Sequence, residues 1–484
     1  MFLNCAFLQI FQAERSKMTD HFDLILKGGM VATPGGIVEA DIGVKNGRIA
    51  DLGSLGSATA KDIIDCTGLH VLPGAIDTQV HFREPGLTHK EDLSTGTLSA
   101  IAGGVTSVFE MPNTEPLTIT GPTFLDKMAR AGEKAFCDYA FFAGGCAENT
   151  HLLAQLERAD GCCGVKIFMG SSTGALLAAK DEVILKILQN GTRRVAMHAE
   201  DEERLKARKH IAEDGNDVRN HPVWRDVECA LLAVKRAVAL AREAGRRIHL
   251  LHVTSGDEMD FLKDHKDIST VETTPQHLTL YAEECYERLG TRAQMNPPIR
   301  DKSHRERLWA AVQKGVVDVL GSDHAPHTLE EKAKPYPASP SGMTGVQTML
   351  PIMLDHMNAG RLSLERVVDL LCHGPQRVYQ ISGKGRITLG YDADFAIVDL
   401  KRQMTISNSW IKSRCGWTPF DNKKVTGWVQ GTVLRGQVVM WDDEITESAR
   451  TRRARGMPVR FQELLTKAAE LPKEHVHISG IECC

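Results

Sequence analysis

The chain has 484 residues, of which 42% are hydrophobic and 25% are charged, a balance typical of a folded globular protein rather than of a disordered or fibrous one. This length exceeds that of one average domain and predicts either two domains or one large barrel with additions. The 58 lysines and arginines against 62 aspartates and glutamates give a net charge of −4, without a long basic run. The charge pattern argues against a nucleic-acid partner and favours a small-molecule partner.

Twelve cysteines occur without a Cys-x-x-Cys pair, which indicates free thiols in a reducing compartment. No stretch reaches the roughly 20 apolar residues that a membrane helix needs, and the first residues lack the pattern of a signal peptide. We therefore expect a cytoplasmic protein without a membrane partner. Residues 1–17, which precede Met18, are expected to form a disordered extension, and residues 462–484 a flexible tail.

Short strands are predicted at both ends of the chain. In the first segment, alternating apolar residues surround Asn46-Gly47, a pair that supplies the positive-φ positions of a tight hairpin turn. A similar pattern, β-branched runs interrupted by glycines, occurs near the other end of the chain. We expect residues 18–70 and 384–461 to form one small β-sandwich domain.

Residues 71–383 carry eight apolar runs of strand length, which alternate with stretches of helical periodicity. Eight such units predict an α/β fold, the TIM (β/α)8 barrel. Seven of the eight runs end in polar clusters. Because the carboxyl ends of barrel strands carry the chemistry of this fold, we expect the active site at that end of the barrel.

Five residues in these clusters are candidate metal ligands: His81, Lys166, His198, His252 and Asp323. Imidazole and carboxylate groups at converging positions are typical of a site for Zn²⁺ or a similar divalent ion. Lys166 lies inside the apolar run VKIFMG, so burial should lower its pKa toward the neutral amine, which can capture carbon dioxide as a carbamate. His249 precedes His252 by three residues, and an odd offset on a strand puts them on opposite faces. Only His252 is therefore expected at the barrel mouth.

Seven segments carry a resemblance to a known family: PGAIDTQVHFREPGLTHKEDL, MPNT, VKIFMGSSTG, MHAED, LLHVTS, MNPPIR and GSDHAPH. Together they resemble the dihydroorotases, cyclic amidohydrolases of the amidohydrolase superfamily, over about residues 22–461. The resemblance implies reversible hydrolysis of L-dihydroorotate to N-carbamoyl-L-aspartate in de novo pyrimidine biosynthesis. It implies a TIM barrel with a β-sandwich domain. We also expect a homo-oligomer that can associate with another pyrimidine-pathway enzyme.

By this resemblance the five residues would bind one or two Zn²⁺ ions, with Lys166 carboxylated. Hydrolysis would use a metal-activated hydroxide, while Asp323 would also act as the catalytic proton shuttle between the attacking water and the leaving nitrogen. The chain departs from the family where most members read His-x-His-x-Arg, because Gln79 replaces the first histidine. A glutamine amide oxygen is a weaker zinc ligand than imidazole, so the second metal position is open to question.

The resemblance also assigns the substrate-binding residues. Arg83 and Asn113 match the positions that hold the substrate carboxylate, a natural role for a guanidinium and an amide, and His327 would assist them. Asn296 matches the position that hydrogen-bonds the edge of the pyrimidine ring. Residues 338–342 partly match the loop that covers the substrate.

Two other functions remain open. A hydantoinase or allantoinase would share the barrel, the metals and the carboxylated lysine, but its substrate lacks the carboxylate that a buried Arg83 would pair with. An inactive dihydroorotase-like structural subunit is the second alternative, with Gln79 as a first sign of decay. Against this second alternative, the five candidate ligands and Arg83 are all retained.

Overall fold

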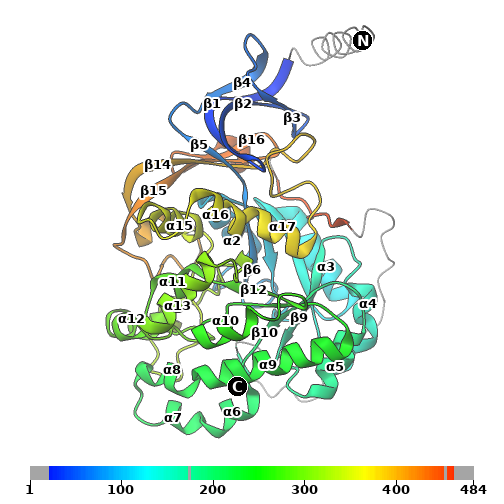
Figure 1. The fold of residues 1–484 in the computed structure, drawn as a ribbon, viewed down its shortest axis with the longest axis vertical. Coiled ribbons are helices and arrows are strands. Elements are labelled where there is room, and N and C mark those ends of the chain that lie inside the picture. Colours follow the sequence, from blue (N-terminus) through cyan, green and yellow to red (C-terminus); the bar gives the residue numbers. More distant parts are fainter. Residues whose placement is uncertain (1–20, 173–175, 452–454, 463–484) are drawn as a thin grey trace.

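The computed structural model describes residues 21–172, 176–451 and 455–462 (Figure 1). The predicted extension at residues 1–17 and all but the first residue of the predicted tail lie outside these ranges. The small β domain and the barrel stand one above the other, with the barrel helices around the lower part of the view.

Strands from both chain ends form one mostly antiparallel sheet of nine strands, so the predicted β domain is confirmed. The sheet contains β1 (His21–Thr33), β2 (Gly36–Lys45), β3 (Arg48–Gly53), β4 (Thr59–Asp65), β5 (His70–Pro73), β14 (Phe395–Thr405), β15 (Lys424–Leu434), β16 (Gln437–Trp441) and β17 (Glu444–Ile445). Strands β5 and β14 join the two chain ends, with Val71 opposite Ile397. The β2–β3 hairpin turns at Asn46 and Gly47, whose φ angles are 52° and 73°.

The predicted barrel is confirmed as an eight-stranded parallel sheet in sequential order. Its strands are β6 (Ala75–Val80), β7 (Val105–Glu110), β8 (Asp138–Gly144), β9 (Cys162–Phe168), β10 (Val195–His198), β11 (Ile248–Leu250), β12 (Ser269–Thr273) and β13 (Val319–Leu320). The last strand has only two residues, and a bridge between Val80 and His324 brings it back to the first. The backbone N–H of His81 donates to His324 O at 2.7 Å and strengthens this closure.

The helices cover the outside of the barrel and its junction with the small domain (Figure 1). They are α2 (Leu93–Ala102), α3 (Gly121–Lys134), α4 (Leu153–Leu156), α5 (Asp181–Gln189), α6 (Glu202–Ala207), α7 (Lys209–Glu213), α8 (His221–Trp224), α9 (Val227–Ala244), α10 (Gly256–Leu262), α11 (Pro275–Thr279), α12 (Ala282–Leu289), α13 (Lys302–Gln313), α14 (Leu329–Lys332), α15 (Met349–Asn358), α16 (Leu364–Val368), α17 (Gly374–Tyr379) and α18 (Glu447–Arg450). Short 3₁₀ and π segments are η1 (Ala147–Leu152), η2 (Val218–Asn220), η3 (Gly290–Ala293), η4 (Asp369–His373) and η5 (Asn408–Trp410).

Helix α9 illustrates why these segments are helical. Asp226 caps its first turn by accepting a hydrogen bond from Cys229 N, and Gly245 ends it with a φ of 65°. Ala230, Ala233 and five further apolar residues repeat on one buried face, which packs on the barrel.

The barrel interior is a packed core and not a pore. Tyr379 from α17 packs edge-on against Phe109 and Phe142, with ring centroids 5.1 and 5.9 Å apart. The nine cysteines in the described ranges are all free thiols, as predicted. Within those ranges, no helix combines the length and the apolar character needed to cross a membrane.

Candidate active site

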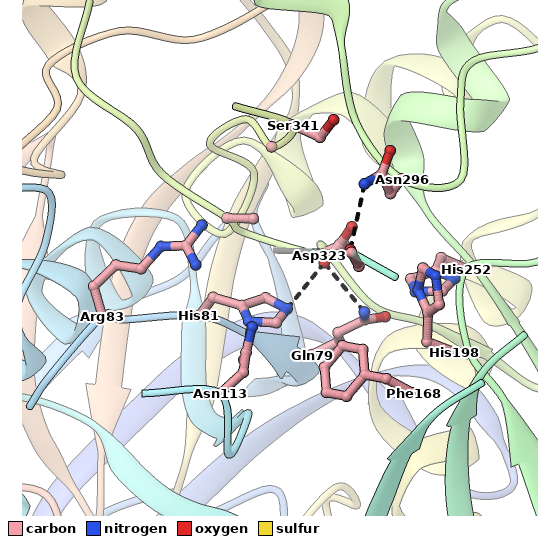
Figure 2. Close-up of a pocket in the computed structure, with 13 residues that line it drawn as sticks. Gln79, His81, Arg83, Asn113, Phe168, His198, His252, Asn296, Asp323 and Ser341 are labelled. Atoms are coloured by element: carbon pink, nitrogen blue, oxygen red, sulfur yellow. Dashed lines mark hydrogen bonds and ion pairs between the residues drawn. The ribbon is translucent and has the colours of Figure 1, made fainter. Parts of the chain in front are cut away.

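A cavity opens at the carboxyl ends of the barrel strands (Figure 2). It brings together eight residues that the sequence singled out: Gln79, His81, Arg83, Asn113, His198, His252, Asn296 and Asp323. Lys166 and His327 lie just behind the cavity wall, where they contact the wall residues Phe168 and Arg83. The strand ends therefore converge on one pocket.

Two histidines on neighbouring strands face each other in this cavity. His198 is the last residue of β10, and its Nδ1 lies 3.0 Å from His252 Nε2. On the far side of the ring, His198 Nε2 lies 3.0 Å from Glu200 Oε2. Burial alone would raise the pKa of Glu200, but Arg225 and the contact with His198 lower it to about 2, so this carboxylate is an acceptor. The proton of His198 is therefore on Nε2, and its Nδ1 lone pair points at His252.

Burial lowers the pKa of both His198 and His252, so both rings are neutral. His252 Nδ1 has no hydrogen-bond partner within the described part of the chain. Two neutral imidazoles with converging nitrogens form a natural pair of ligands for one divalent ion. Glu200 supports this geometry from behind, as carboxylates commonly do for metal-binding histidines.

His249 and His252 do not lie on opposite faces of a strand. Strand β11 ends at Leu250, and His252 has a φ of 35°, so regular alternation stops between them. His249 lies deeper in the barrel, with its Nδ1 2.8 Å from Thr270 Oγ1 and its ring 5.5 Å from that of Tyr379. Both side chains are on the inner side of the barrel, at different depths, which corrects the expectation drawn from their spacing.

Asp323 follows the last strand, and Gln79 and His81 both face its carboxylate (Figure 2). Its Oδ1 accepts a hydrogen bond from Gln79 Nε2 at 3.1 Å and lies 3.4 Å from His81 Nε2. His81 Nδ1 donates to Asn113 Oδ1 at 2.8 Å, so the Nε2 lone pair of this ring is directed at Asp323. Asn113, assigned to the substrate by resemblance, thus also orients a candidate metal ligand. Gln79 Oε1 has no partner among the described residues.

Lys166 is fully buried, and its Nζ has no hydrogen-bond partner within the described ranges. The Nζ lies 4.4 Å from the centre of the Phe168 ring. Burial lowers the pKa of this amine to about 7, although Asp323 and Glu272 act in the opposite direction. The neutral form of the amine is therefore populated at neutral pH. This unpartnered amine beside the candidate ligands is chemically ready for carboxylation.

Arg83 carries a buried charge that makes no ion pair with a carboxylate of the described chain. Its side chain is 2% exposed, and its φ of 62° is unusual for a residue with a side chain. The guanidinium donates to Pro326 O at 3.2 Å and lies 3.2 Å from His327 Nε2, which is itself 3.0 Å from Ser341 O. In the described parts of the chain, no carboxylate lies within 4 Å of it. An anion is needed here to complete the site.

Several residues of the site escaped the sequence reasoning. Glu200 carried a signal, because it stands two residues after His198 in MHAED. His221 Nε2 lies 3.0 Å from Asn296 Oδ1, and Trp417 Nε1 donates to His327 O at 2.8 Å. Trp417 belongs to the segment between β14 and β15 of the small domain, and no motif in the sequence links it to the barrel.

The predicted covering loop lies at the rim of the cavity. Ser341 and Gly342 both line it. The buried Lys332 holds this loop by donating to Pro340 O at 2.7 Å and to Gln294 O at 3.1 Å. The loop is thus anchored by a lysine that does not line the cavity.

An acidic cluster elsewhere is not a second metal site. Asp138, Asp392 and Asp394 come close together, but Lys384 Nζ lies among them, 3.0 Å from Asp392 and 2.6 Å from Asp394. These carboxylates raise the pKa of Lys384, and Arg435 contacts Asp138 from the other side. The cluster is an ion-pair network that joins barrel strand β8 to the small domain.

Comparison with known proteins agrees with this geometry. A sequence model of the amidohydrolase family matches residues 70–439, and one of the N-terminal domain of the urease alpha-subunit matches residues 9–73. The chain is 35% identical to an allantoinase from Deinococcus radiodurans over 442 residues, which cover 89% of this chain and 98% of that one. It is 36% identical to a dihydroorotase from Halobacterium salinarum over 397 residues, or 80% and 89% of the two chains.

The fold is also shared with a solved structure. The L-hydantoinase (dihydropyrimidinase) from Arthrobacter aurescens superimposes with a TM-score of 0.84 at 33% identity, over 88% of this chain and 97% of that one. The relatives are divided among dihydroorotases, allantoinases and hydantoinases, so they agree on the hydrolysis of a cyclic amide and differ in the substrate. The chain therefore belongs to the amidohydrolase family.

Proposed function

We propose that the protein is a dihydroorotase, which interconverts L-dihydroorotate and N-carbamoyl-L-aspartate by opening and closing the ring amide. The observation that carries this proposal is Arg83, a buried guanidinium at the cavity with no carboxylate within 4 Å of it in the described chain. Dihydroorotate brings a carboxylate to pair with it, whereas hydantoin and allantoin do not. Discrimination by such a buried polar partner is large, because the wrong substrate leaves the charge unpaired.

The donor set fits a divalent ion such as zinc. His81, His198, His252 and Asp323 present nitrogen and oxygen atoms toward the cavity, and Lys166, once carboxylated, adds a carbamate. Such an ion, when bound, polarises the ring carbonyl and makes water a better nucleophile at neutral pH. Asp323 accepts the proton of the attacking water and delivers it to the ring nitrogen that leaves.

The remaining residues orient the substrate. Arg83 holds the carboxylate, with His327 beside it, and Asn113 keeps His81 turned toward Asp323. Asn296, fixed by His221, offers its amide N–H to the edge of the ring. These contacts fix the scissile amide relative to Asp323.

A substrate panel tests the proposal. Purified protein is offered dihydroorotate, hydantoin and allantoin at equal concentration, and kcat/KM is measured for each. We expect dihydroorotate to be hydrolysed and the other two to react far more slowly. A higher kcat/KM for hydantoin or allantoin would mean that the chain is a cyclic amidase of the other kind. A lack of turnover in both directions, with less than stoichiometric metal, would favour the structural subunit.

Arg83→Met should impair substrate binding and leave the metal in place. Loss of a charge-assisted hydrogen bond predicts a drop in kcat/KM for dihydroorotate of about 10- to 100-fold, mostly through KM. Arg414→Met is the matched control, because Arg414 lies on the neighbouring loop, pairs with Asp92 and does not line the cavity. Metal loss in Arg83→Met, measured by plasma mass spectrometry, would contradict the division between ligands and substrate residues.

Gln79→His tests whether the glutamine limits metal binding. The amide N–H of Gln79 donates to Asp323, so only the neutral amide oxygen is left to bind a metal. Imidazole is a stronger zinc ligand than an amide oxygen. We expect the histidine variant to hold more zinc per chain at the same free zinc concentration. Gln79→Asn serves as the control, since it keeps the amide and should not gain metal. Equal zinc content in wild type and Gln79→His would show that Gln79 does not limit metal binding.

The quaternary structure stays a prediction. The resemblance to the dihydroorotases predicts a homo-oligomer that can associate with another pyrimidine-pathway enzyme. Light scattering coupled to gel filtration gives the mass in solution, and a single-chain mass of 53.3 kDa would contradict the oligomer.

A further inference from the structure

A second cavity lies at the amino ends of β9, β10 and β11, opposite to the active site. Its lining includes four arginines: Arg193, Arg194, Arg247 and Arg377. None of the described residues that line it is acidic. In a protein with a net charge of −4, this local excess of positive charge has to be explained.

Two of the four arginines have evident structural partners. Arg377 pairs with Asp369 at 2.6 Å, and the Arg193 guanidinium lies 4.8 Å from the centre of the Phe461 ring. Arg194 donates to Ile248 O at 3.1 Å, but no carboxylate of the described chain lies within ion-pair distance of Arg194 or Arg247. Neither of these two guanidinium groups is therefore in ion-pair contact with a carboxylate of the described chain.

Arg194 and Arg247 bring two like charges to the wall of one cavity. Burial lowers the pKa of Arg194 to about 10, and the like charge of Arg247 acts in the same direction. Asp318 opposes this effect, but its carboxylate is already bound to Lys266 and to Val271 N. Two guanidinium groups that line one cavity are stabilised by an anion that both can bind.

A polar group without a partner lies in the same wall. Tyr379 lines the cavity and is 7% exposed, and its hydroxyl has no hydrogen-bond partner among the described residues. The Tyr379 ring packs against Phe109 and Phe142. Because these contacts fix the ring, the hydroxyl cannot swing out into solvent. A buried donor without a partner costs free energy unless a ligand completes it.

We propose that this cavity, the arginine pocket, binds a small phosphate-bearing anion through Arg194, Arg247 and Arg377. The three guanidinium groups come from the starts of β10 and β11 and from α17, and planar forks of this kind suit phosphate oxygens. Strand β10 begins after Arg194 and ends at His198, so the strand separates the two sites by roughly 13 Å. The anion binds away from the substrate and does not compete with it.

Calorimetric titration at low ionic strength tests the arginine pocket. Pyrophosphate is the probe, and citrate is the comparison, because it is a polyanion whose charges are carboxylates. We expect one saturable pyrophosphate site in the wild-type protein and weaker binding of citrate. Arg247→Gln should weaken pyrophosphate binding about tenfold or more, and so should Arg377→Gln. Both side chains are exposed, so the variants should fold.

Arg242→Gln is the matched control, because Arg242 is an exposed arginine at the end of α9 that pairs with Asp267 and does not line the pocket. It should bind pyrophosphate like the wild type. The proposal fails if pyrophosphate does not saturate a site, if Arg247→Gln and Arg377→Gln bind it as tightly as wild type, or if citrate binds more tightly. Competition between pyrophosphate and dihydroorotate would place the anion in the active site and would also overturn it. The readout is independent of the proposed catalytic function.

Discussion

Lys166→Ala is expected to lower kcat for dihydroorotate by about a thousandfold or more, the scale at which members of a catalytic unit act. The lysine lies just behind the cavity wall beside Phe168, and its Nζ has no hydrogen-bond partner within the described ranges. A short carboxylic acid such as propionate, added to the variant, should restore part of the activity by occupying the place of the carbamate. Steady-state rates with and without propionate, together with zinc content, give the result.

Lys127→Met is the control that distinguishes the loss of a carbamate from the loss of a buried lysine's contacts. Lys127 is also fully buried, but its Nζ contacts Glu110 and donates to Met111 O at 2.9 Å. Removing one partner of such a pair should lower the free energy of unfolding by about 3–5 kcal/mol. Propionate should not rescue this variant. Rescue of both variants alike, or of neither, would argue against a carbamate at Lys166.

Replacing Lys166 should stabilise the metal-free protein, whereas replacing Lys127 should destabilise it. Burial lowers the pKa of this amine from 10.5 to about 7, so at pH 7 the unfolded chain binds more protons at Lys166 than the native chain does. The cost to stability is on the order of 4 kcal/mol at pH 7 and disappears as the pH rises toward 10.5. Lys166→Met should therefore raise the free energy of unfolding in urea while abolishing activity. A lower free energy of unfolding would mean that Lys166 has a structural partner.

The barrel could be predicted because its sequence signals are local. Each strand is a short apolar run, and polar residues mark the end at which the runs converge, so Asp323 and His198 could be placed together from different parts of the chain. The pairing of β5 with β14 is less local, since it joins segments more than 300 residues apart. The two chain ends carry a similar β-type sequence pattern, and this similarity was sufficient to assign them to one β domain.

The contacts that refine the site could not be predicted in this way. Trp417 reaches His327 from the small domain, and Thr344 Oγ1 donates to Trp417 O at 2.6 Å, so this contact depends on how the two domains pack. The depths of His249 and His252 depend on where β11 ends, and a strand boundary is not fixed by periodicity alone. Sequence patterns thus indicate which residues converge, while tertiary packing decides their orientation.

Asp323→Asn is expected to lower kcat by about 10²- to 10⁴-fold, the usual contribution of a positioned acid or base. The amide has the shape of the carboxylate but cannot accept a proton, so the attacking water keeps its proton and the leaving nitrogen does not receive one. Gln79 donates to Oδ1 of Asp323, and the asparagine oxygen can accept the same bond, so the side chain should stay in place. Binding of dihydroorotate should change little, because Arg83 holds its carboxylate.

Asp318→Asn is the matched control, since it makes the same exchange just before strand β13 at the opposite end of the barrel, beside Lys266. It should retain kcat, even if the loss of that ion pair lowers its thermal stability. Zinc content measured on both variants separates the proton shuttle from metal binding: a drop in kcat with zinc retained identifies Asp323 as the shuttle. If Asp323→Asn keeps a kcat near that of the wild type, another group moves the proton, and Glu272, buried beside Lys166, becomes the next residue to test.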